Sequence, residues 1–333
     1  MSSMNIERAA RVLEAYLAAD VPAFLWGAPG IGKSDLVKQI ADKASLPLID
    51  VRAVLLDPVD LRGLPMVDQA SRTATWAAPG FLPQAQRDGE RGILLLDELN
   101  AAPTSVMAAC LQLILNRRLG EYVLPPAWRI VAAGNRQSDR AAAQRMPSAL
   151  ANRFSHIEVE PDVGAWRLWA NANNVDPLIV AFLAFRPELL HKMDGSDLRA
   201  FPTPRAWSQV AKVAPKAPDD IRMNLVAGLV GEGPAGEFEA FVRLYRSLPP
   251  IASIIADPKK AIVPTEPATL FAVSIALGRY ATRENFEAVM TYGRRLPKEF
   301  AIVLCLDAVK RDPTLLETAA FVAWARDNQD VSL

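Results

Sequence analysis

The residues best suited to chemistry begin at Gly27, where the chain reads Gly-Ala-Pro-Gly-Ile-Gly-Lys-Ser. This spacing fits G-x-x-x-x-G-K-[ST], the phosphate-binding loop. Its glycines let the backbone turn tightly and bring N–H groups close to phosphate oxygens. Lys33 would add a positive charge at the β- and γ-phosphates, and Ser34 a hydroxyl ligand for Mg²⁺. We therefore expect ATP and Mg²⁺ as cofactors, held by Gly27, Ala28, Pro29, Gly30, Ile31, Gly32, Lys33 and Ser34.

Two adjacent carboxylates, Asp97 and Glu98, follow the apolar run Ile93–Leu96. Such a run is typical of a strand buried on both faces, and α/β sheets place their chemistry at the carboxyl ends of strands. Burial of two carboxylates without a nearby cation is costly, so a metal–nucleotide partner explains them. Asp97 would hold Mg²⁺ through its water shell, and Glu98 would activate the attacking water as general base. The alternative is a strand that runs into a charged surface turn.

A second apolar run, Trp128–Gly134, ends in the polar side chain of Asn135. Because Asn135 follows the strand after Asp97 and Glu98, the same α/β logic places it near the γ-phosphate, where it would touch the phosphate or orient the attacking water. The alternative is an asparagine that only terminates a strand in a turn.

Four arginines follow within a short span, and one chain cannot easily use all of them on its own triphosphate. An arginine donated across a subunit interface is a known device for stabilising transition-state charge. Arg153 is the first choice for this role and Arg145 the second; the alternative is a solvated basic face. The four are Arg136, Arg140, Arg145 and Arg153.

The elements that position these residues follow from hydrophobic periodicity. Pro22–Trp26 reads as a short buried strand before the loop and Asp35–Ala44 as a helix after it, which is the order that the mechanism requires. The other expected elements are a helix at Asn5–Ala19 capped by Ser3 or Asn5, a strand at Pro47–Val51, a turn and short helix at Asp57–Gly63, and a helix at Pro103–Arg117 with Thr104 or Ser105 near its cap.

Leu64–Trp76 reads as a small hairpin, because alternating residues flank a polar centre at Asp68–Arg72. A hairpin inserted in an α/β core serves partners or substrate, or else is a tolerated insertion without a role.

Composition bounds the class of protein. The chain has 333 residues, of which 51% are hydrophobic and 22% charged, and it carries 37 basic and 37 acidic residues. Zero net charge argues against a strongly basic nucleic-acid binder. Cys110 and Cys305 lie in apolar helical patterns and are expected to be buried free thiols, and His156 and His191 have no metal-ligand spacing. With no signal core and no apolar run near ~18 residues, we expect a cytoplasmic protein without membrane contact.

From Pro161 onward the pattern is helical and proline-punctuated. A Pro- and Lys-rich link at Asp257–Pro267 precedes a last helical block that contains no motif, and packing helices or a partner-docking surface are both open readings of it. The expected helices are Ala165–Asn173, Pro177–Phe185, Pro204–Val213, Asp219–Leu229, Glu237–Ser247, Thr269–Tyr280, Thr282–Tyr292, Pro297–Lys310 and Pro313–Arg326.

With these motifs in this order, the chain resembles the AAA+ ATPases, and most closely their MoxR and midasin/dynein-related branch. Gly27–Ser34 matches Walker A, Ile93–Glu98 matches Walker B, and the run from Asp97 to Pro103 is close to that branch's D-E-I-N-R-A pattern. Ala101-Ala102 departs from this pattern because it lacks the usual arginine, which removes one expected interface charge. The hairpin sits where the branch has its helix-2 insert.

The resemblance also assigns roles downstream. Asn135 matches sensor 1, Met146–Phe154 matches the segment with the arginine finger, and Thr203–Ala206 matches the sensor 2 motif. Arg205 would then reach the γ-phosphate of its own subunit, so that the implied catalytic set is Glu98, Asn135, Arg153 and Arg205.

The fold implied by the resemblance is an α/β P-loop core at 1–160 with a five-stranded parallel sheet, the P-loop strand central, and a helix-2 hairpin insert. An all-α lid at 161–256 and a helical extension at 257–333 would follow. The resemblance further implies a hexameric ring, a von Willebrand A-domain partner and an activity that remodels or activates a client protein. A nucleic-acid motor or loader and a nucleotide-switched scaffold are the alternatives.

Overall fold

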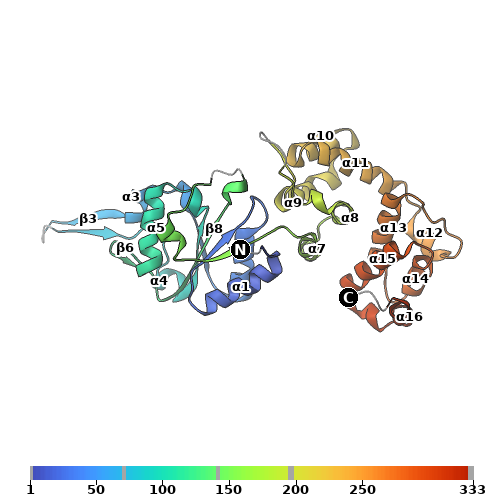
Figure 1. Cartoon of the computed structure of the whole chain (residues 1–333), viewed down its shortest axis with the longest axis horizontal. Coiled ribbons are helices and arrows are strands. Elements are labelled where there is room, and N and C mark those ends of the chain that lie inside the picture. Colours follow the sequence, from blue (N-terminus) through green and yellow to red (C-terminus); the bar gives the residue numbers. More distant parts are fainter. Residues whose placement is uncertain (1–2, 70–72, 140–142, 194–198, 329–333) are drawn as a thin grey trace. The chain divides into compact units, whose positions relative to one another are not determined.

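The structure is a computed structural model that describes residues 3–69, 73–139, 143–193 and 199–328. It divides into two compact units (Figure 1). The first contains Met1–Ala165 and Thr203–Arg205, and the second contains Trp166–Pro202 and Ala206–Leu333. Each unit is described by itself.

The first unit is built on a parallel sheet of five strands in the order β2-β5-β8-β1-β9. The strands are β1 (Ala23–Trp26), β2 (Leu48–Arg52), β5 (Arg91–Asp97), β8 (Ala127–Gly134) and β9 (Ser155–Glu158). The five-stranded parallel sheet was expected, but the central place of the P-loop strand was wrong. β8 holds the centre, and β1 lies between β8 and the edge strand β9, because β8 is the strand that pairs with both β5 and β1.

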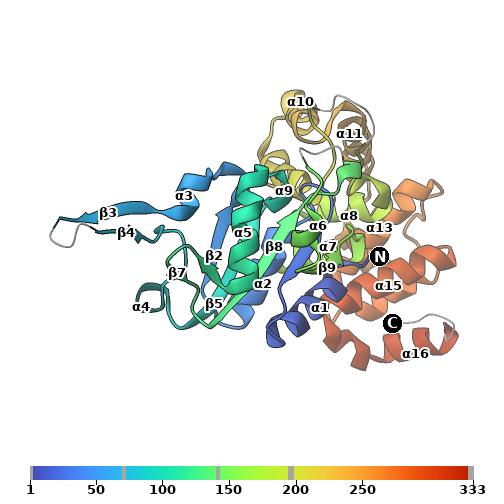
Figure 2. The same cartoon turned by 60° about the vertical axis from the view of Figure 1, so that its left-hand side comes forward.

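The inner strands are apolar on both faces because helices cover both sides of the sheet. Residues 92–97 of β5 are all buried. Leu94 and Leu96 belong to one core cluster with residues of α5 (Thr104–Asn116), whereas α2 (Lys33–Lys43) contacts β5 and β8 and packs beside α1 (Ile6–Ala18) (Figure 2). Successive side chains along each inner strand therefore point alternately into the two hydrophobic layers on either side of the sheet.

Helix starts were predicted with mixed success. Asn5 caps α1, and its side chain accepts a hydrogen bond from the backbone N–H of Arg8, as expected for a short polar residue at that position. In α5 the N-cap is Pro103 and Thr104 is the first helical residue beside it, as expected, but no side chain caps the helix. The smaller elements are α3 (Pro58–Arg62), α4 (Ala85–Asp88), α6 (Ser148–Ala151) and the hairpin of β6 (Arg118–Leu119) and β7 (Tyr122–Val123).

The expected hairpin consists of β3 (Leu64–Asp68) and β4 (Thr73–Ala77), which project from the unit as a ribbon of their own (Figures 1 and 2). The turn at 70–72 lies outside the described residues. At the base, the Arg62 guanidinium lies 4.4 Å from the centroid of the Trp76 ring, and the backbone N–H of Trp76 donates to the Glu121 carboxylate at 3.0 Å. Along β3, Leu64, Met66 and Val67 are exposed.

His156 has a structural role, in keeping with its lack of metal-ligand spacing. Its Nδ1 accepts from the Trp26 indole N–H at 2.8 Å, and its Nε2 lies 2.9 Å from the Ala151 carbonyl. An indole N–H can only donate and a carbonyl can only accept, so the imidazole is neutral and carries its proton on Nε2. No cluster of His, Cys, Asp and Glu suited to a metal ion occurs among the described residues.

Helices are the only regular elements in the described part of the second unit. Pro177–Phe185 (α8) and Pro204–Val213 (α9) have the expected bounds, but α11 begins at Glu232, five residues before the expected start. The expected helix Pro313–Arg326 is interrupted at Thr318, and α12 (Ile251–Ala256) was not expected. The remaining helices are α7 (Val163–Ala172), α10 (Asp219–Val230), α11 (Glu232–Arg246), α13 (Pro267–Tyr280), α14 (Phe286–Gly293), α15 (Lys298–Arg311) and α16 (Ala319–Asp327).

Each unit has its own core, and each core contains one cysteine. Cys110 lies with α5 in the core of the first unit, and Cys305 lies on α15 in a core formed between Ile254 and Trp324. Both are free thiols with no exposed surface, as expected, and burial raises the pKa of each to about 12. Over the described residues, no helix is both long and apolar enough to span a bilayer.

Candidate nucleotide-binding site

The loop Gly27–Ser34 joins β1 to α2, as its motif requires. Gly30 and Gly32 have φ of 75° and 99°, in the left-handed region that side chains disfavour. Gly32 is the N-cap of α2 and offers no capping side chain. The backbone N–H groups from Gly30 to Asp35 have no acceptor in the described part of the chain. Unpaired N–H groups at a helix N-terminus form a cradle for an anion.

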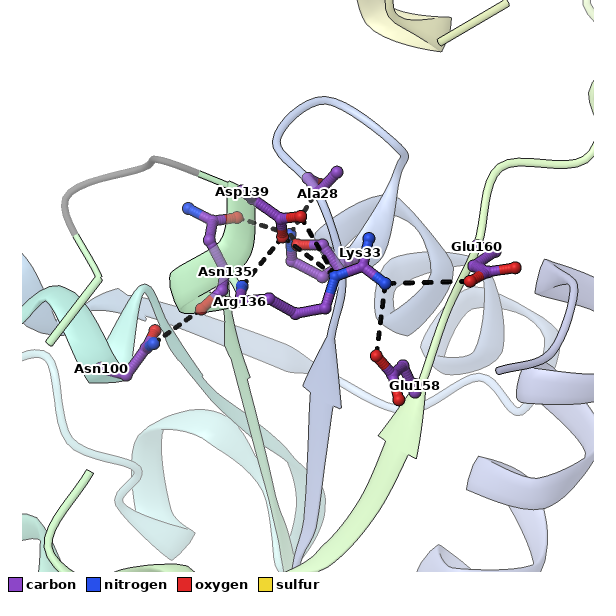
Figure 3. A network of polar contacts seen from close by, with 9 residues as sticks. Ala28, Lys33, Asn100, Asn135, Arg136, Asp139, Glu158 and Glu160 are labelled. Carbon is purple, nitrogen blue, oxygen red and sulfur yellow. Dashed lines mark hydrogen bonds and ion pairs between the residues drawn. The ribbon is translucent and has the colours of Figure 1, made fainter. Parts of the chain in front are cut away.

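Lys33 lies at the bottom of this loop and is 9% exposed. Its ammonium donates to the carbonyls of Gly27 at 2.8 Å and Ala28 at 3.0 Å, and to Oδ1 of Asn135 at 2.9 Å (Figure 3). Burial lowers the pKa of Lys33 to about 8, and the attraction of Asp97 opposes this effect. The chain therefore holds a cation whose charge is poorly compensated, which favours binding of an anion.

Ser34 and Asp97 meet at the carboxyl end of the sheet, where the Ser34 hydroxyl donates to Oδ2 of Asp97 at 2.7 Å. Asp97 is the last residue of β5, and Oδ1 of its carboxylate accepts from the backbone N–H of Glu98 at 2.9 Å. A hydroxyl and a carboxylate are the oxygen donors that Mg²⁺ prefers, so these residues fit the ion.

Glu98 has a left-handed backbone, with φ of 55° and ψ of 32°. This region is unfavourable for a residue with a side chain, and such residues gather at functional sites. Glu98 is half-buried, and its carboxylate has no hydrogen-bond or ion-pair partner among the residues with described positions. Its carboxylate oxygens therefore remain available as hydrogen-bond acceptors.

A charged network borders Lys33 on the other side (Figure 3). The Arg136 guanidinium contacts Asp139 at 3.1 Å, Glu158 at 3.2 Å and Glu160 at 3.9 Å. The charge of Asp139 raises the pKa of Lys33, whereas those of Arg136 and Arg205 lower it. Arg136 is thus held by its own subunit.

The other arginines are placed unequally. The backbone N–H of Arg205 donates to the carbonyl of Gly30 at 3.1 Å, which brings this residue to the loop. Arg145 and Arg153 are exposed and make no hydrogen bond or ion pair with Lys33, Ser34 or Asp97. Arg140 lies outside the described residues. The structure therefore gathers Lys33, Ser34, Asp97, Asn135 and Arg205, and leaves Arg145 and Arg153 apart.

Comparison with known proteins identifies this arrangement. Residues 22–154 match the family described as AAA domain (dynein-related subfamily), and midasin from Giardia intestinalis is 32% identical over 163 residues. Residues 22–154 therefore form an AAA domain of the dynein-related branch of the AAA+ ATPases. The midasin match covers 47% of this chain and 3% of that protein, so the relative is far larger.

Solved structures similar to this chain include a mutant of RuvB from Thermotoga maritima, with 17% identity, a TM-score of 0.40, and coverage of 82% of this chain and 81% of that one. A putative ATPase from Cytophaga hutchinsonii has 15% identity, a TM-score of 0.38, and coverage of 79% and 92%. The assignment rests on the family match and on the midasin similarity.

Sequence reasoning missed one residue of this AAA+ site. Asn100 is buried and donates to the backbone carbonyl of Asn135. Its only signal was its place two residues after Glu98, at the asparagine of the Asp97–Pro103 run.

Proposed function

We propose that this chain is a MoxR-like ATPase that hydrolyses ATP with Mg²⁺ as the subunit of a hexameric ring, and that it remodels or activates a client protein with a von Willebrand A-domain partner. The observation that carries the ATPase proposal is the Ser34–Asp97 contact of 2.7 Å beside the buried Lys33. These groups come from a loop and a strand that are far apart in sequence, and they meet beside a row of unpaired N–H groups.

The residues divide the work by their chemistry. The N–H groups from Gly30 to Asp35 and the Lys33 ammonium bind phosphate oxygens. The Ser34 hydroxyl and the Asp97 carboxylate would hold Mg²⁺. Mg²⁺ supplies charge neutralisation at the phosphates when bound. Glu98 takes a proton from the attacking water, and Asn135 and Arg205 contact the γ-phosphate in the same subunit.

Two substitutions test the division between binding and turnover. Lys33→Ala removes the buried cation and should weaken ATP binding at least 100-fold, whereas Glu98→Gln keeps the shape and should leave affinity within about threefold while turnover falls at least 100-fold. Isothermal titration calorimetry and phosphate release measure the two quantities. Lys38→Ala and Glu90→Gln are matched controls on exposed residues of the same unit. Undiminished turnover in Glu98→Gln would rule out its role as general base.

The client proposal has a separate test. Glu98→Gln should hold ATP and client together without release, so affinity purification of this variant with ATP and Mg²⁺ should retain a stoichiometric protein. Recovery of a von Willebrand A-domain protein would support the MoxR-like assignment. Recovery of nucleic acid would instead favour a motor or loader.

A further inference from the structure

Asn100 lies at the junction of three segments of the site. Its Nδ2 donates to the backbone carbonyl of Asn135 at 2.8 Å (Figure 3), and its own carbonyl accepts from the backbone N–H of Gln144 at 2.8 Å. Asn100 itself follows Glu98 in the turn after β5. It therefore joins the end of β8 to this turn and to the segment that carries Arg145.

The amide of Asn100 is held tightly and is only partly satisfied. The residue is 1% exposed, and Oδ1 has no hydrogen-bond partner among the described residues. A Cβ at Gly134 would lie 2.0 Å from this oxygen, so the amide occupies the space that the glycine leaves open. A buried acceptor without a donor destabilises a fold, and an apolar side chain would avoid this cost. The amide at this position therefore has a use other than stability.

That use follows from the next link in the chain of contacts. Asn135 accepts the Nδ2–H of Asn100 at its backbone carbonyl, and its side-chain Oδ1 accepts from the Lys33 ammonium at 2.9 Å. Holding the carbonyl of a residue at the end of a strand holds its backbone in place, and the backbone limits which side-chain rotamers are allowed. Lys33 in turn lies where β- and γ-phosphates bind.

We propose that Asn100 is a positioning residue that acts through Asn135: its amide fixes the end of β8 so that the Asn135 side chain meets Lys33 and the γ-phosphate. The proposal rests on the nucleotide site proposed above. It predicts that substitution of Asn100 weakens the binding of nucleotides with a γ-phosphate and hardly changes the affinity for those without one.

The test compares Asn100→Ala, Asn135→Ala and the double variant, with Asn116→Ala as a control on an exposed asparagine of the same unit. Affinities for ADP and for ATPγS are measured with Mg²⁺, together with ATP turnover. We expect each single substitution to reduce the preference for ATPγS over ADP at least fivefold and turnover at least tenfold. The double variant should be no worse than Asn135→Ala, because Asn100 has no other route to the phosphate.

The proposal would be overturned if the losses of ATPγS preference from the two single substitutions multiplied in the double variant. It would also be overturned by equal losses of ADP and ATPγS affinity, which indicate general loosening of the fold. Thermal unfolding of the variants distinguishes such loosening from a local effect at the site. If Asn100→Ala does not fold, Asn100→Ser takes its place. If the wild type binds ATPγS but does not turn over ATP, only the proposed hydrolysis is contradicted. The role of Asn100 is then still tested by the comparison of ADP and ATPγS affinities.

Discussion

At the scale of single residues, the central feature is a cation kept away from water. The pKa of Lys33 falls from 10.5 to about 8 because of its burial, which corresponds to roughly 3 kcal/mol against the charged form. An unfolded chain would keep the lysine proton up to higher pH. The nucleotide-free fold therefore gains stability from this group as the pH rises from about 8 to 10.5.

Nucleotide binding should show the opposite trend. Phosphate beside Lys33 favours the charged form, so binding takes up a proton and weakens as the pH passes the pKa of the free site. If the bound pKa returns near its ordinary value, ATP affinity should be roughly tenfold weaker at pH 9 than at pH 7. Calorimetry in buffers with different ionisation enthalpies counts the proton. Ser34→Ala should bind more weakly but retain the uptake; no proton uptake in the wild type would contradict the assignment.

Residue types alone predicted much of this site. A glycine loop with a lysine and a hydroxyl predicts phosphate binding, and two acids after an apolar strand predict a metal or a general base. The structure brings Ser34 of the loop to Asp97 of the strand. Asn100 could not be predicted in this way. Its importance lies in a contact with the backbone of Asn135, and an asparagine near a turn is equally typical of the surface.

At the scale of elements, the hairpin base depends on the absence of a side chain at Gly63. Its φ is 85° and its ψ −164°, and a Cβ would lie 2.0 Å from the Ala77 carbonyl oxygen. Gly89 has nearly the same backbone, with φ of 92° and ψ of 164°, but open space around it. Gly89→Ala should cost about 2 kcal/mol of unfolding free energy from backbone strain, and Gly63→Ala about 4, because steric overlap is added.

Urea denaturation measures the difference between these two glycine variants. If both variants lose a comparable unfolding free energy, the hairpin base relaxes around the new side chain, and the close approach to Ala77 does not contribute to the cost.

The edges of the hairpin are protected although its faces are not. The backbone N–H of Trp76 donates to Glu121 and so points away from β3. Pro65 and Trp76 are therefore a pair without ladder hydrogen bonds. Pro65 therefore places its missing N–H at the outer edge, where proline is tolerated and blocks pairing with another strand. Contacts with a partner would then use the exposed side chains of Leu64, Met66 and Val67.

Elements with a strong period or a proline boundary were predictable, as α8 and α9 show. Those set by tertiary contacts were not. The edge strand β9 is only four residues long, and the interruption at Thr318 arises where a hydroxyl caps α16 through the Phe321 N–H. Short elements depend on the surface they meet more than on their own residues.

At the scale of the whole molecule, the proposed ring requires a residue that acts across an interface. Arg153 is exposed and makes no ion pair within the described chain, whereas Arg136 is held by three carboxylates of its own subunit. Arg153→Ala should lower turnover at least 100-fold, since an arginine in trans stabilises transition-state charge.

Mixing Arg153→Ala with Glu98→Gln subunits should restore part of this turnover, because some interfaces then combine an intact Glu98 with an intact Arg153. Arg145→Ala provides the comparison for the second candidate. Absence of any recovery in the mixture, with assembly verified by light scattering, would argue for a role of Arg153 within its own subunit.

The two buried cysteines can serve as native probes of local unfolding. One thiol lies in each core, and neither reacts as a thiolate at neutral pH while it is buried. Alkylation therefore requires that the surrounding core open. The rate at Cys110 would time the opening of the sheet domain, and the rate at Cys305 that of the last helices, so mass spectrometry could follow each part of the native chain without an introduced probe.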